Sequence, residues 1–178
     1  MSQSPETHHI IENFVLSELK IGQSAEMSRR LQRTDIELFA AVSGDINPAH
    51  LDESYAETTL FHAVIAHGMW SGALVSALLG TKLPGPGTIY LGQSLRFRHP
   101  IKIGDHVTAR VEISAIDHDR GRVTLACQCV NQAAETVLSG EAEVLAPKEK
   151  IRRAANALPK INIVEGDELV GQPYEPVP

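Results

Sequence analysis

The chain has 178 residues, which is enough for one ordinary domain with a sizeable core and too short for two large ones. Hydrophobic residues make up 43% and charged residues 21%, a composition that excludes an intrinsically disordered chain. The net charge of −6, with no long basic run, argues against nucleic acid as a partner.

The first half of the chain predicts one strand and two helices. Imperfect alternation over residues 24–32 favours a strand. Thr34 and Glu37 have the spacing of a capping box, and apolar residues then recur at helical spacing, so we expect a short helix from near Asp35 to Gly44. A largely apolar segment over residues 67–79 predicts a second, buried helix.

The second half of the chain predicts a β-sheet. After Gly80 and the Pro/Gly turn at residues 83–87, the hydrophobic pattern changes to a period near two. It predicts four strands separated by polar turns, at residues 88–98, 107–115, 123–129 and 136–145. One strand, a buried helix and four consecutive strands most simply give an α+β fold, an antiparallel sheet wrapped around a central helix.

The two ends differ in composition from this segment. We expect a polar leader at residues 1–21, a domain at residues 22–146, and an arm or linker at residues 147–178, where the chain is charged and then proline-rich. The leader lacks the pattern of a secretory signal, and the apolar stretch at residues 68–79 is shorter than the ~20 residues that span a bilayer. We therefore expect no membrane partner.

Cys127 and Cys129 are two residues apart on a predicted strand, so their side chains share one face and do not point at each other. A disulfide between them is not expected. A reducing compartment fits this pattern, and we predict a cytoplasmic location.

Asp45 and His50 are the first candidates for chemistry. They flank the turn-forming residues Asn47 and Pro48, and proline stiffens such a segment, so the two side chains can converge. A carboxylate beside an imidazole can move protons near neutral pH. In the alternative interpretation, Asp45 only caps the turn and His50 only packs.

The start of the buried helix is the second candidate. His67 and Gly68 stand there, and the first amides of a helix have no partner within it, so they can stabilise a developing negative charge. Gly68 has no side chain to block a thioester carbonyl. We expect His67 to support the site by orienting the start of the helix. In the alternative interpretation, Gly68 only permits close packing.

Residues 41–52, AVSGDINPAHLD, resemble the hydratase signature of the MaoC-like enoyl-CoA hydratases and dehydratases. The similarity continues through residues 65–69 (IAHGM), 83–85 (LPG) and 89–95 (IYLGQSL), and covers roughly residues 22–146. The resemblance implies a hot-dog fold, a homodimer, and hydration of trans-2-enoyl-CoA to (R)-3-hydroxyacyl-CoA.

By motif position, the resemblance implies that Asp45 and His50 are the catalytic pair, that Gly68 supplies the oxyanion amide, that Asn47 supports the loop and that Ser76 lies near the site. Either member of the pair can be the base; we favour Asp45, with His50 assisting. No metal or other cofactor is expected, because the pair can move the protons without one; coenzyme A is part of the substrate.

Weaker candidates are basic residues on the predicted strand. Arg96 and Arg98 can contact the phosphates of coenzyme A, although alternating charges on a strand are more often simply solvated. His62 lies five residues before His67, but no zinc-type spacing accompanies the two, so we predict no metal site.

Two other functions remain compatible with the sequence: an acyl-CoA thioesterase, and a non-catalytic acyl-CoA-binding or scaffold subunit whose tail docks a partner. The tail segment at residues 149–153 resembles the junction at which some such domains precede a phosphate acyltransferase domain. Because no second domain follows here, we predict no acyltransferase activity.

Overall fold

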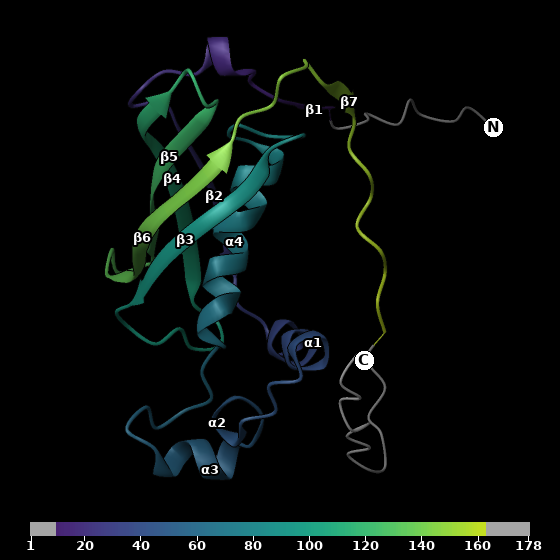
Figure 1. Cartoon of the computed structure of the whole chain (residues 1–178). Helices are drawn as coiled ribbons and strands as arrows, with labels where there is room; N and C mark the ends of the chain where they lie inside the picture. The colour runs from purple at the N-terminus through teal and green to yellow at the C-terminus, as the bar shows by residue number, and fades with distance from the viewer. Residues whose placement is uncertain (1–9, 163–178) are drawn as a thin grey trace, which may run out of the picture.

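The computed structural model describes residues 10–162 (Figure 1). A five-stranded antiparallel sheet, in the order β2-β4-β5-β6-β3, packs against one long helix, α4. This arrangement confirms the predicted α+β fold. The elements are β2 (Ser24–Arg30), α4 (Gly68–Thr81), β3 (Ile89–Phe97), β4 (His106–Asp117), β5 (Arg122–Val130) and β6 (Thr136–Leu145).

The core lies between the sheet and α4. Along β4 and β5, alternate residues are buried, as the period of two predicts. Cys127 and Cys129 both belong to the buried set and are free thiols. They pack in one cluster with apolar residues of α4, where burying each leucine contributes about 1.5–3 kcal/mol. None of the helices within residues 10–162 is long and apolar enough to cross a membrane.

Helix α1 (Arg33–Ser43) begins two residues earlier than predicted. The carboxylate that caps it belongs to Asp35, which accepts a hydrogen bond of 2.9 Å from the backbone N–H of Gln32. The predicted capping box of Thr34 and Glu37 is therefore wrong, because Gln32 is the last extended residue and Asp35 occupies the third helical position. The helix ends at Gly44 with a φ of 74°, as expected for a left-handed C-cap.

The segments on either side of the predicted domain pair with each other. Strand β1 (Ile10–Glu12) and strand β7 (Arg152–Ala154) form a separate two-stranded antiparallel sheet. A short 3-10 helix, η1 (Leu16–Glu18), follows β1. The predicted leader and arm are thus joined to each other, and the rest of both, residues 1–9 and 163–178, lies outside the described residues.

Candidate active site

The loop after α1 carries Asp45 and His50. The predicted turn contains a one-turn helix, α2 (Pro48–Leu51), and a second short helix, α3 (Glu53–Thr58), follows it. Asn47 caps α2, since its Oδ1 accepts a hydrogen bond of 3.1 Å from the N–H of Ala49. Pro48 suits the first helical position, because the N–H that proline lacks would have no partner within the helix there. The loop is therefore held by its own sequence, with Asn47 capping α2.

Within this loop, Asp45 is exposed and His50 is buried. One carboxylate oxygen of Asp45 accepts a hydrogen bond of 3.2 Å from the N–H of Asn47, so the carboxylate also takes part in the turn. Its second oxygen remains available. One carboxylate oxygen of Asp45 therefore caps the turn, and the other is free for chemistry.

The structure brings Asp45 and His50 together with His67. One side-chain oxygen or nitrogen from each of the three lies within 4.8 Å of those of the others. The Nδ1 of His50 is 2.9 Å from the carbonyl oxygen of Ile65, and a carbonyl only accepts, so Nδ1 carries the proton. In the neutral ring, Nε2 of His50 is then a hydrogen-bond acceptor.

His67 is the residue immediately before α4. Its Nε2 is 2.9 Å from the backbone carbonyl oxygen of Asp45, and its ring is 2% exposed. The ring centroid lies 3.9 Å from that of His50 and 5.0 Å from that of Phe39 on α1. His67 therefore connects the loop with the start of the central helix.

Gly68 begins α4 beside a cavity of about 230 Å³. A side chain at Gly68 would meet the ring of Phe97, since an added Cβ would lie 3.2 Å from it. The walls are mostly apolar and the start of α4 forms part of them, which suits an acyl group with a polar end. The lining residues are Phe61, Ala66, His67, Gly68, Ser71, Phe97, Arg98, His99, Pro100, Ile101 and Val137.

Most residues of this cavity were not predicted as site residues from the sequence, Ser71 and Phe97 among them. Ser71 is buried one turn into α4, and its hydroxyl donates a hydrogen bond of 2.7 Å to the carbonyl of Gly68. The sequence signal that could have indicated Ser71 is a polar serine within an otherwise apolar helix. Phe97 at the end of β3 gave no such signal, because only the sheet order shows which strand lies next to α4.

The remaining predicted residues lie further away or at the rim. Ser76 is exposed on α4, eight residues or ~12 Å along the axis from Gly68, and does not line the cavity described above. Arg98 borders the cavity and its Nε donates to the hydroxyl of Ser139 at 3.3 Å, whereas Arg96 is exposed on β3 and does not border it. The roles of these three residues stay predictions.

Among the described residues, Asp45, His50 and His67 are the group whose atoms are close enough to hold a metal ion. His62, the other histidine considered for such a site, is exposed and contacts the carbonyl of Glu57 instead. Each ring of the group already uses one nitrogen on a backbone carbonyl. We keep the acid–base interpretation, and the absence of a metal requirement stays a prediction.

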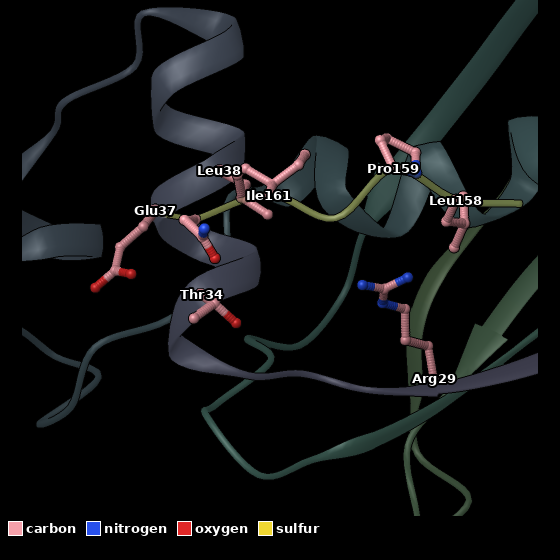
Figure 2. Close-up of a pocket in the computed structure, with 8 residues that line it drawn as sticks. Arg29, Thr34, Glu37, Leu38, Leu158, Pro159 and Ile161 are labelled. Carbon is pink, nitrogen blue, oxygen red and sulfur yellow. The ribbon is translucent and has the colours of Figure 1, made fainter. Parts of the chain in front are cut away.

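A larger hollow of about 840 Å³ lies between α1 and the segment after β7 (Figure 2). It contains none of the predicted site residues, whereas His67, Gly68 and Arg98 line the cavity beside Gly68. Its lining residues are Arg29, Thr34, Glu37, Leu38, Leu158, Pro159, Ile161 and Asn162. The cavity beside Gly68 is therefore the better candidate for the active site.

The chain is similar to proteins of known family. The chain is 48% identical over 130 residues to an (R)-specific enoyl-CoA hydratase from Rhodospirillum rubrum, covering 73% of this chain and 90% of that protein. It is 46% identical over 129 residues to an (R)-specific enoyl-CoA hydratase from Aeromonas caviae, covering 72% of this chain and 96% of that protein.

Among solved structures, the unliganded (R)-hydratase from Pseudomonas aeruginosa superposes with a TM-score of 0.83 at 49% identity, covering 88% of this chain and all (100%) of that one. The predicted hot-dog fold is thereby confirmed. The profile of the MaoC like domain matches residues 17–134. The chain belongs to the MaoC-like domain family.

Proposed function

We propose that the chain hydrates trans-2-enoyl-CoA thioesters to (R)-3-hydroxyacyl-CoA, and catalyses the reverse dehydration. The observation that carries this proposal is the convergence of Asp45 and His50, together with a cavity that begins at Gly68. Relatives at 43–48% identity named as (R)-specific enoyl-CoA hydratases and a 3-hydroxybutyryl-CoA dehydratase support it.

The pair activates one water molecule. The free oxygen of Asp45 accepts a proton from the water, while Nε2 of His50 accepts a hydrogen bond from its other hydrogen. The oxygen of the water forms a bond to C3 of the enoyl group as the C2–C3 double bond opens. Asp45 then returns its proton to C2, so that the elements of water are added and the carboxylate is regenerated.

Negative charge collects on the thioester oxygen while C2 is still without its proton. The N–H of Gly68 is the first of α4 and has no partner within the helix, so it can donate to this oxygen. The positive end of the helix dipole acts in the same direction. These groups suffice for hydration, which changes no oxidation state overall, so we propose that no cofactor is needed.

We also propose that two copies pair through β3. This strand is at one edge of the sheet and most of its residues are exposed. Ile89, Leu91 and Phe97 leave large apolar side chains uncovered on it, and Met69 of α4 does the same. An exposed apolar edge strand is suited to pairing with its own copy about a two-fold axis.

Light scattering should show that the wild-type protein is a dimer. Leu91→Glu should shift it to the monomer, and a monomeric wild type would contradict the proposed pairing.

The proposed location is a reducing compartment such as the cytoplasm. Both cysteines are free and lie buried on β5. Such pairs of reduced thiols are usual where glutathione and thioredoxin operate.

The function is tested with crotonyl-CoA, by following the loss of the conjugated thioester in the ultraviolet and resolving the product by chiral chromatography. We expect the (R)-3-hydroxy product. Asp45→Asn and His50→Ala should each lower kcat by about 10²–10⁴-fold. The exposed His62→Ala is the control and should keep wild-type turnover.

Other outcomes separate the alternatives. Release of free thiol without a hydroxyacyl product would instead indicate a thioesterase. Binding of the thioester with neither reaction would indicate a non-catalytic acyl-CoA-binding subunit. In either case the proposed hydration would be wrong.

A further inference from the structure

His67 contacts three parts of the site at once. Its Nε2 bonds the backbone carbonyl of Asp45 at 2.9 Å, its ring lies against that of His50, and it directly precedes Gly68. Asp45 and His67 are 22 residues apart in sequence, so this hydrogen bond joins two separate segments of the chain.

We propose that His67 is a positioning residue, whose Nε2–H holds the backbone of Asp45 so that its carboxylate faces His50 and the start of α4. The inference rests on the proposed function of Asp45 and His50 and adds to it. His67 transfers no proton in this role.

The side chain of His67 is not used to cap its own helix. In α2 and α3, the residue before the helix accepts a hydrogen bond from a backbone N–H of the first turn, as Asn47 and Asp52 do. His67 occupies the same position before α4 and makes no side-chain capping bond. Its imidazole is directed instead to the carbonyl of Asp45.

The hydrogen bonding also fixes the tautomer of the ring. A carbonyl accepts only, so the proton shared with Asp45 belongs to Nε2 of His67. The Nδ1 of His67 is buried without a partner among the described residues, so a proton there would have no acceptor. The neutral ring therefore carries its proton on Nε2, where it holds the loop.

The other ties of Asp45 are local. Its N–H donates to the hydroxyl of Ser43 at 3.2 Å, and its carboxylate accepts from Asn47 at 3.2 Å. Ser43 is the last residue of α1 and Asn47 belongs to the loop, so neither bond reaches α4. The bond from His67 is thus the described hydrogen bond that fixes Asp45 relative to α4, and a displacement of about 1 Å at a reacting group can cost about 10²-fold in rate.

A matched pair of variants isolates this bond. In His67→Gln, the amide nitrogen is the same number of bonds from Cβ as Nε2 is, so it can still reach the carbonyl of Asp45. In His67→Asn the amide nitrogen is one bond closer to Cβ and cannot reach the carbonyl of Asp45. Both variants are polar and both lose the ring stacking, so they differ mainly in the hydrogen bond.

We expect His67→Asn to lower kcat for crotonyl-CoA by about 10–10²-fold with little change in KM, because a displaced Asp45 carboxylate impairs the proton transfers more than the binding of the thioester. His67→Gln should recover most of the loss. Circular dichroism and thermal unfolding of the full chain check that both variants fold. A purely structural role would lower the stability of both variants and would not separate their kcat values.

A second measurement does not depend on activity. In the wild-type chain labelled with ¹⁵N-histidine, the neutral ring of His67 should show its proton on Nε2 by long-range ¹H–¹⁵N correlation. A proton on Nδ1 would overturn the proposal, even if His67→Asn fails to fold.

The two proposals fail differently. If the wild type hydrates crotonyl-CoA but the Gln and Asn variants have the same kcat, the positioning role is wrong and the proposed function stands. If the wild type does not hydrate it, the proposed function is wrong, and with it the role of His67 in that reaction.

Discussion

The side chain of Asn13 accepts a hydrogen bond of 2.8 Å from the backbone N–H of Ile151, 138 residues later in the chain. Its amide nitrogen donates to the carbonyls of Pro86 and Glu149, at 3.0 and 2.8 Å. Asn13 is fully buried, so each of these bonds replaces one to water. One amide therefore ties the N-terminal segment, the turn after α4 and the segment before β7 to one another.

Asn13→Ala should lower the free energy of unfolding by about 2–3 kcal/mol, because it removes three partly buried hydrogen bonds at once. Urea unfolding measures the change. The exposed Lys20→Ala serves as control and should remain within about 0.5 kcal/mol of the wild type. An equal effect of both variants would show that Asn13 does not hold the two segments.

This junction illustrates what the sequence could not predict. A lone asparagine in a polar leader has no pattern, and pairing between residues near both ends depends on tertiary contacts. The alternation along β4 and β5, by contrast, is a local property that burial of one sheet face imposes, so those strands were predicted almost to the residue.

The candidate active site shows the same difference between what local sequence predicts and what tertiary contacts decide. Asp45 and His50 stand in one short, distinctive motif and Gly68 in another, and the structure places them around one end of α4. Phe97 and Val137 come from distant strands and reach the cavity only because β3 and β6 are neighbours in the sheet. Sequence spacing does not carry that information.

The cap of α1 is a second testable point, because two candidate caps were possible. Asp35→Ala should destabilise the protein by about 1–2 kcal/mol, since the carboxylate accepts from Gln32 and contacts Arg29. Thr34→Ala should have little effect, because Thr34 is exposed. Thermal unfolding of the two variants compares them directly. A larger loss for Thr34→Ala would restore the capping box predicted from the sequence.

The two cysteines should be unreactive in the folded protein. Burial raises the pKa of Cys127 to about 11 and that of Cys129 to about 12, from the model-peptide value of 9.0. Raising the pKa of a thiol lowers its thiolate fraction at any lower pH, and the thiolate is the reactive form.

At pH 8, a disulfide reagent that labels free thiols should therefore react far more slowly with the native chain than with the chain in denaturant. As the pH rises, the unfolded thiols should react faster through about pH 9, while the folded thiols stay protonated until the pH approaches 11. Rapid labelling of native protein at pH 8 would show that the strand β5 opens readily to solvent.

The N–H of Gly68 can be removed without removing the helix. Proline is tolerated at the first helical position, and His67 before it has φ −55° and ψ 135°, the extended conformation that a residue before proline prefers. Gly68→Pro therefore deletes the proposed oxyanion donor at a position where the backbone can accept it.

The matched control is Gly68→Ala. Both substitutions add a Cβ that presses on the ring of Phe97 at 3.2 Å, but only alanine keeps the N–H. Relative to Gly68→Ala, Gly68→Pro should lower kcat for crotonyl-CoA by about 10²–10³-fold, which is the usual loss for one oxyanion donor. Because the thioester oxygen gains its charge only as water adds, KM should change much less than kcat. Equal kcat values for the two variants would mean that the start of α4 does not stabilise the enolate, and that another group receives the charge.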